Sequence, residues 1–184
     1  MVNKLTTYFH SRTKLWVIGV LLLLIIIMFF ILPTVEEIFH ISQDMVSIDE
    51  PDMHTPQEIH NILSDWGEQG RIKQVWFHST WDIILPVLYF FFIGFLISFF
   101  TRRGFKSESP FRKMSLVSLI AVVDILENIA LFILIFSFPS KYGFMGWIKT
   151  GLTLTKYFIF GPAIVIALII AVVFAIKNRF VVQE

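Results

Sequence analysis

The sequence predicts an all-α integral membrane protein built as a bundle of four transmembrane helices. Hydrophobic residues make up 56% of the 184 residues and charged residues 16%, whereas soluble domains are about 45–50% apolar and about 25% charged. The excess is concentrated in four runs, each long enough to cross a bilayer as a helix, which takes about 20 residues. These runs do not alternate between polar and apolar positions, so they do not fit transmembrane strands.

The four runs cover residues 15–32, 81–100, 116–138 and 151–176, and we expect a single membrane domain over residues 1–184. Pro33 and Pro139 are predicted to end the first and third runs, and basic residues follow the second and fourth. The first run has the basic flank of a signal peptide, but its length exceeds a usual hydrophobic region and no small-residue cleavage site follows it. We interpret it as an uncleaved, structural first helix.

Lysine and arginine are distributed unequally between the two sides of the predicted bundle. Ten lie in the two tails and in the loop between the second and third runs, namely Lys4, Arg12, Lys14, Arg102, Arg103, Lys106, Arg112, Lys113, Lys177 and Arg179. Four lie on the opposite side, namely Arg71, Lys73, Lys141 and Lys149. Because short basic loops stay in the cytoplasm, we expect a multi-pass protein of the cell membrane with both termini cytoplasmic.

The long first loop, residues 33–80, is therefore predicted to be extracytoplasmic, and part of it to be helical. After an acidic stretch, Thr55, Pro56 and Glu58 form the pattern of a capping box with proline in the first turn. Apolar residues then follow at helical spacing, which predicts an amphipathic helix over 56–66 that ends at Gly67 and Gly70. This helix either packs on the ends of the membrane helices or acts as a lid.

Three polar residues interrupt the third apolar run near its middle. Asp124, Glu127 and Asn128 are spaced i, i+3, i+4, so they share one face of a helix. An ionisable group at this depth costs about 2.5–3.5 kcal/mol on insertion scales, and such groups usually face the protein interior. Two acids one turn apart should not both stay ionised unless a cation is near, and a pair that shares a proton suits acid–base work. We therefore predict Asp124 and Glu127 as candidate catalytic groups.

The second run adds polar groups from its outer half. Asp82, Pro86 and Tyr89 fall on one helical face, and His78 lies one turn before Asp82. Pro86 has no N–H, so it frees a backbone carbonyl that must be satisfied within the bundle. We predict Asp82, Tyr89 and Asn128 as ligand-binding residues.

The fourth run contributes a cation. Lys156 shares a helical face with Thr153, Tyr157 and Phe160, and Gly161–Pro162 is expected to kink this helix. Lys156 either pairs with the acidic cluster or extends outward to the membrane surface. We predict Lys156 and Tyr157 as further ligand-binding residues.

Several classes of function find no support in the sequence. The chain has no cysteine, which excludes thiol catalysis and cysteine-bound zinc. We see no nucleic-acid-binding motif, no nucleotide fingerprint and no Ser-His-Asp arrangement, and we expect no cofactor. Donors for a metal are present on the outer side, namely His40, His54, His60, His78, Glu36 and Asp82. No metalloprotease motif is present, and we predict no metal site.

The chain also resembles a known family in its layout. A long loop precedes a second span that opens Trp81-Asp82-Ile83-Ile84-Leu85-Pro86-Val87-Leu88-Tyr89, and the fourth span reads Thr153-Leu154-Thr155-Lys156-Tyr157-Phe158-Ile159-Phe160-Gly161-Pro162. This layout resembles the EXPERA family, which includes emopamil-binding sterol isomerases and the sigma-two receptor. The resemblance implies a helical bundle around a pocket for a sterol or amphipathic amine, with Asp82, Pro86 and Pro162 as pocket-forming positions. The chain is also similar to uncharacterised bacterial four-helix membrane proteins with a Gly-Arg pair (Gly70–Arg71) and an Asp-x-x-Glu-Asn motif, which implies no function.

Three functional hypotheses follow from these patterns. The first is a protein that binds or transforms a membrane lipid or another hydrophobic small molecule, using the intramembrane acids as proton donor and acceptor. The second is a small proton-coupled transporter that uses the same acids, although a single four-helix chain without an inverted repeat would have to oligomerise. The third is a non-catalytic subunit, whose partner is a second copy or another membrane protein and whose polar groups hold helices together.

Overall fold

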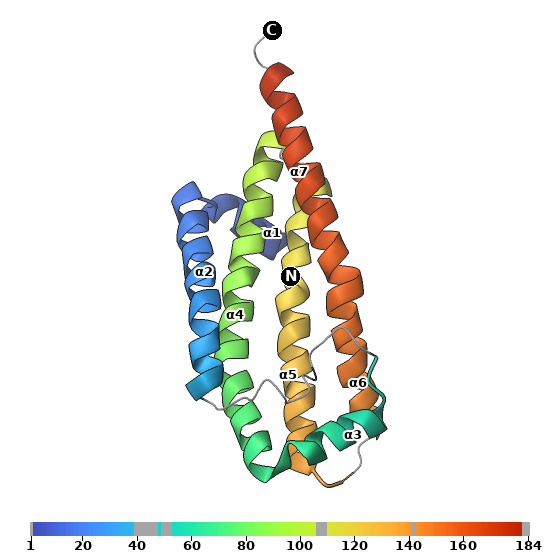
Figure 1. Cartoon of the computed structure of the whole chain (residues 1–184). Coiled ribbons are helices and arrows are strands. Elements are labelled where there is room, and N and C mark those ends of the chain that lie inside the picture. The colour runs from blue at the N-terminus through green and yellow to red at the C-terminus, as the bar shows by residue number, and fades with distance from the viewer. Residues whose placement is uncertain (1, 39–47, 49–52, 106–109, 141–142, 182–184) are drawn as a thin grey trace. The chain divides into compact units, whose positions relative to one another are not determined.

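The computed structural model describes residues 2–38, 48, 53–105, 110–140 and 143–181 (Figure 1). Helix accounts for 93% of these residues, and none of them forms a strand. Four helical stretches are long and apolar enough to cross a membrane: Leu15–Val35, Gly67–Gly104, Lys113–Ser137 and Gly143–Asn178. The fold is thus all-helical with four candidate membrane spans, as the apolar runs predicted.

The chain groups into two compact units. Unit one contains Met1–Ile26, Val87–Ala121 and Phe160–Glu184. Unit two contains Ile27–Pro86 and Val122–Ile159. Each unit has its own buried apolar core, and the candidate site residues predicted from the sequence, apart from Tyr89, belong to unit two.

Unit one begins with a helix that the sequence analysis treated as a tail. This helix, α1 (Val2–Arg12), precedes α2 (Leu15–Ile38). It buries Phe9 in a core with Ile18 and Phe95, a residue of α4 (Gly67–Gly104). A Cβ atom on Gly94 would lie 2.4 Å from the Phe9 ring, so glycine at this position lets the ring lie against α4.

The remaining helices of unit one are η1 (Pro110–Leu119), a 3₁₀-helix, and α7 (Gly161–Val181). Helix η1 contacts both α1 and α7. The Asn178 side-chain N–H donates to the carbonyl of Gly104 at 2.5 Å, which joins the end of α7 to the end of α4.

Unit two contains the amphipathic loop helix at the place predicted for it. Helix α3 (Pro56–Asp65) starts with the expected capping box. The Thr55 N–H donates to the Glu58 carboxylate at 2.6 Å, and the Glu58 N–H donates to the Thr55 hydroxyl oxygen at 3.3 Å. Gly67 has φ of +62° and turns the chain directly into α4, a conformation that a side chain would disfavour.

Helix α3 packs on α5 (Ile120–Ser137) and α6 (Gly143–Leu154), and Figure 1 shows it lying across their neighbouring ends. The apolar side of α3 forms a core with α5, which consists of Ile48, Ile59, Ile62, Leu63, Trp66, Leu131, Leu134 and Ile135. At α6, a Cβ atom on Gly146 would lie 2.9 Å from the Pro56 Cβ atom. Glycine at position 146 therefore allows the start of α3 to approach the backbone of α6.

Three predicted boundaries were wrong. Pro33 lies inside α2 instead of ending it, because proline removes one backbone hydrogen bond and a membrane helix tolerates that loss. Gly70 lies inside α4 because Gly67 alone makes the turn between α3 and α4. Helix α6 begins at Gly143, before residue 151.

The fourth candidate span contains a π-helical segment, η2 (Thr155–Phe160), between α6 and α7. It directly precedes Gly161–Pro162, where the sequence predicted an irregularity. A regular α-helix would bring the Pro162 ring against the Phe158 carbonyl, and the wider π-helical turn relieves that contact. The same segment carries Lys156.

Candidate functional site

A buried carboxylate on α5, Glu127, is the centre of the charged cluster. Glu127 is 1% exposed. Its Oε2 atom lies 2.6 Å from the Lys156 ammonium, which also lies 2.8 Å from the Asp124 carboxylate. Lys156 therefore bridges the two acids of α5. Of the two alternatives for Lys156, the structure shows the side chain paired with the acidic cluster and not extended outward.

Two further members of this cluster, Lys149 and Thr153, were not predicted as site residues, although Thr153 was placed on the same helical face as Lys156. The Lys149 ammonium lies 3.2 Å from Glu127 Oε1, and the Thr153 hydroxyl donates to the same oxygen at 2.6 Å. Lys149 was counted with the outer loop because it precedes the apolar run, but it lies in α6 and is 1% exposed. The signal was present in the spacing, since Lys149, Thr153 and Lys156 fall at i, i+4, i+7 on one helical face.

Lys149 and its neighbour Thr150 hold the segment that leads into α3. The Lys149 ammonium donates to the carbonyl of Ile48. The Thr150 hydroxyl donates to the carbonyl of His54 at 2.6 Å, just before the capping residue Thr55. The charged cluster and the position of α3 are therefore linked through neighbouring residues of one helix.

A second link joins α5 to α4 through Asn128. Its side-chain N–H donates to the carbonyl of Asp82 at 3.0 Å. Asp82 lies four residues before Pro86, so its carbonyl is the one that Pro86 leaves without a backbone donor. The sequence predicted that this carbonyl would need a partner, and the structure identifies the partner as Asn128, a residue selected independently for its place in the cluster.

The Asp82 side chain pairs within its own helix. Its carboxylate lies 2.5 Å from Nδ1 of His78, one turn earlier, and His78 is buried. Asp82 thus uses its side chain toward His78 and its backbone toward Asn128. Both contacts fix the stretch of α4 that leads into Pro86.

The two predicted tyrosines lie in different places. Tyr157 follows Lys156 and is 43% exposed, with its ring centre 5.3 Å from the Lys156 ammonium. Tyr89 belongs to unit one, whereas the residues of the cluster belong to unit two.

The cluster is balanced in charge. Two lysines, Lys149 and Lys156, face two carboxylates, Asp124 and Glu127. Breaking a buried pair of this kind by removing one partner typically costs about 3–5 kcal/mol. Each carboxylate thus lies beside a lysine, the arrangement that the sequence allowed as the alternative to a shared proton.

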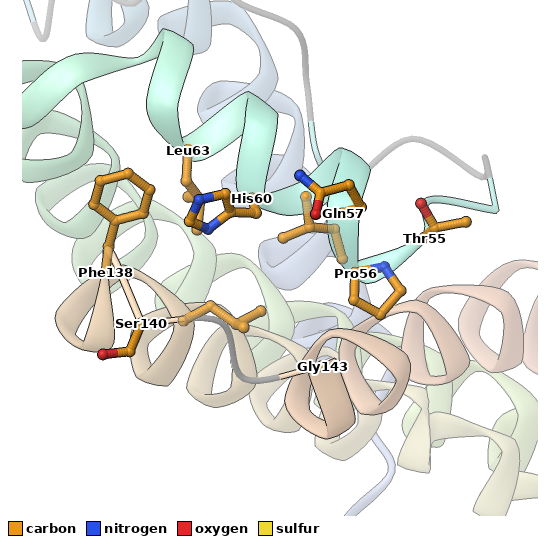
Figure 2. Close-up of a pocket in the computed structure, with 10 residues that line it drawn as sticks. Thr55, Pro56, Gln57, His60, Leu63, Phe138, Ser140 and Gly143 are labelled. Atoms are coloured by element: carbon orange, nitrogen blue, oxygen red, sulfur yellow. The ribbon is translucent and has the colours of Figure 1, made fainter.

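A pocket of about 350 Å³ lies beneath α3 (Figure 2). It is lined by Thr55, Pro56, Gln57, Ile59, His60, Leu63, Leu134, Phe138, Ser140 and Gly143. Figure 2 shows the His60 and Leu63 side chains directed from α3 toward Phe138. None of the site residues predicted from the sequence belongs to this described lining.

Aromatic and cationic contacts hold one wall of the pocket. The His60 and Phe138 rings stack with their centres 5.0 Å apart. The Arg71 guanidinium lies 4.1 Å from the centre of the Phe138 ring and also donates to the Leu63 carbonyl at 2.8 Å. Arg71, which was not predicted as a site residue, thus joins α3, α4 and the end of α5.

Donors for a metal ion do not gather in the part of the chain that the structure describes. Those residues contain no group of three or more His, Asp or Glu side chains that could hold one. Two of the outer donors named from the sequence, His40 and the Glu36 side chain, lie outside that part, as does the acidic stretch that precedes residue 53.

Together, the four candidate spans and the paired charges define a helical membrane protein with an internally neutralised polar centre. No protein-family model, curated protein or solved structure matches the chain. The layout resemblance to the EXPERA family stays a prediction from the sequence.

Proposed function

We propose that this chain is a multi-pass protein of the cell membrane, with both termini cytoplasmic, that binds a lipid-like hydrophobic small molecule in the pocket beneath α3. The observation that carries the proposal is the pocket itself. Its volume of about 350 Å³ falls within the range of about 300–1,000 Å³ that is usual for ligand sites.

The lining of the pocket suits a molecule with an apolar body and a polar end. Its apolar lining comes from Ile59 and Leu63 on α3 and from Leu134 and Phe138 at the end of α5. Polar groups come from Gln57, His60, Ser140 and Thr55, which can orient a hydroxyl, amine or carbonyl. The third apolar run ends at this level, where a membrane amphiphile has its polar end.

In this proposal the charged cluster holds the walls of the pocket in place. Glu127 joins α5 to α6 through Lys149 and Thr153, and to η2 through Lys156. The next residue of α6, Thr150, holds the backbone that leads into α3. We do not extend the proposal to acid–base catalysis by Asp124 and Glu127, because lysines pair with both and neither lines the pocket.

The test is to fill the pocket from its rim with Ser140→Trp. Ser140 is exposed and lines the pocket, so an indole there should occupy the space without disturbing the buried core. The matched control is Ser64→Trp, an exposed position of α3 outside the described lining. Binding of an environment-sensitive dansyl fatty acid to the detergent-purified chain should fall at least tenfold for Ser140→Trp and stay unchanged for Ser64→Trp. Equal binding by the two variants would contradict the proposal.

A second function, a non-catalytic membrane subunit, is favoured by the complete pairing of the cluster. Polar groups that only hold helices together need no ligand, and Lys149, Lys156, Asp124 and Glu127 all have partners within the chain. A stable complex with another membrane protein, isolated after crosslinking in the membrane, together with no effect of Ser140→Trp on dansyl fatty acid binding, would favour this function.

A further inference from the structure

Unit one contains a second, cationic pocket, which the proposed function does not use. Its volume is about 430 Å³, and it is lined by Thr13, Leu15, Phe99, Arg102 and Arg103. Two adjacent arginines thus face the start of α2 across one cavity. From this geometry we propose that the pocket binds the phosphate headgroup of an anionic membrane lipid.

The two arginines are held in place by contacts with uncharged groups. One guanidinium N–H of Arg102 donates to the carbonyl of His10 near the end of α1, at 2.9 Å. The Arg103 guanidinium lies over the Phe99 ring, 3.6 Å from its centre. Within the described part of the chain, neither arginine forms an ion pair with a carboxylate. Each therefore keeps N–H donors and a full positive charge for a ligand.

This arrangement matches the chemistry of a phosphate group. A guanidinium presents five N–H donors in a planar fork that fits phosphate oxygens, and stacking on an aromatic ring keeps the fork in one plane. The start of α2 adds a weaker attraction for an anion. The Ile18 N–H makes the first α-helical bond, to the Lys14 carbonyl, so the N–H groups of Leu15 and Trp16 precede the hydrogen-bonded ladder.

A membrane lipid fits the pocket better than a free anion because apolar groups surround the arginines. Leu15 and Phe99 line the pocket itself, and both Leu15 and Trp16 are strongly exposed at the start of the apolar run. Exposed tryptophan at the end of a membrane helix is typical of the headgroup level. Anionic lipids attract basic side chains at this level by about 1 kcal/mol for each lysine or arginine.

The experiment titrates the detergent-purified full chain with phosphatidylglycerol and, separately, with zwitterionic phosphatidylcholine, and counts bound lipids by native mass spectrometry. The double variant Arg102→Gln/Arg103→Gln should bind phosphatidylglycerol about 30-fold more weakly, from about 1 kcal/mol for each arginine. Arg103→Gln alone should cost about fivefold, and it leaves the bond between Arg102 and α1 intact. Binding of phosphatidylcholine should not change.

The control removes two exposed lysines of unit one outside the pocket, as Lys4→Gln/Lys177→Gln. This variant should stay within about twofold of the parent chain. If it loses as much phosphatidylglycerol as the arginine pair, or if Arg103→Gln has no effect, the pocket is not a specific site and the proposal fails. Inorganic phosphate serves as a competitor. If phosphate alone binds as tightly as the lipid, the pocket is a site for a soluble anion and the lipid assignment is overturned.

Discussion

Two pairs of basic side chains, one pair in each unit, have opposite surroundings. In unit two, Lys149 and Lys156 are buried or nearly buried, and carboxylates of α5 match both. In unit one, Arg102 and Arg103 are exposed beside a pocket and have no carboxylate partner in the described chain. A charge removed from water must be matched inside the protein, whereas an exposed charge can stay unmatched and remain available to a ligand. Pairing thus distinguishes charges that hold helices together from charges that remain available to a ligand.

The largest effect is expected from removing one carboxylate of the cluster. Glu127→Gln keeps the shape of the side chain but leaves two lysines with one acid. We expect the chain to lose about 3–5 kcal/mol of stability, the usual cost of breaking a buried pair, measured by unfolding of the detergent-purified protein.

The contrasting variant is Arg103→Gln in unit one, which removes an exposed charge. It should cost less than about 1 kcal/mol, the range for exposed ionic and cation–π contacts. Similar losses for Glu127→Gln and Arg103→Gln would break the comparison between the two units.

An effect smaller than that of Glu127→Gln is expected at the uncharged link between α5 and α4. Asn128→Leu removes the donor to the Asp82 carbonyl and should cost about 1–3 kcal/mol, because a buried acceptor is left unsatisfied. In Pro86→Ala the backbone N–H returns to that carbonyl, so Asn128→Leu should cost less in that background. A double-mutant cycle from denaturant unfolding measures the coupling. Strictly additive losses would show that Pro86 and Asn128 act independently.

The close packing of α3 on α6 can be tested with substitutions that change no charged residue. Gly146→Ala places a methyl group against Pro56, and we expect a loss of about 1 kcal/mol, at the low end for overpacking. The control is Gly151→Ala on the same helix, where a Cβ atom meets nothing within 4 Å. That change should stabilise the helix slightly. Thermal unfolding of the two variants in parallel checks the sign, and losses of equal size would contradict close packing at Gly146.

The smallest effect is expected at the exposed cap of α3. Hydrogen bonds from the Thr55 backbone and then from its side chain lower the pKa of Glu58 below its ordinary value of 4.5. A carboxyl with a lowered pKa adds stability that is fully present above pH 4.5 and is lost as the pH falls through the lower, folded-state pKa. At acid pH, amide hydrogen exchange in the first turn of α3 should therefore become faster in the parent chain than in the Glu58→Gln variant. The glutamine of that variant does not titrate, so its cap does not change with pH. The same pH dependence in both would rule out Glu58 as its cause.

The sequence predicted the long apolar helices and the start of α3 because both depend on local patterns. Twenty apolar residues have few alternatives to a membrane helix, and the Thr55–Glu58 cap is made within one turn. It also placed Asp124, Glu127 and Asn128 on one face, since helical spacing alone decides that. Helix α1 was missed because it is short and of mixed polarity, and such helices are stabilised mainly by tertiary packing.

The partners of the polar residues were harder to predict because they lie on other helices. Lys149 was placed in a loop by its position before the apolar run, although its spacing from Lys156 carried the needed signal. The donor to the carbonyl freed by Pro86 could not be named without knowing which helix packs beside α4. The pocket beneath α3 is made by side chains from three segments, and no spacing within a single segment indicates it.

The division of charge between α5 and the fourth candidate span also has a consequence for biogenesis. If each entered the bilayer alone, α5 would carry two acids and the fourth span would carry two lysines. The cost of insertion would be about 2.5–3.5 kcal/mol for each of these groups. Once Lys156 lies against Asp124 and Glu127, with Lys149 beside Glu127, the charges cancel. The ribosome makes the acids first, so α5 would wait near the translocon until the lysines emerge. We therefore expect the two segments to leave the translocon together, as one helical hairpin.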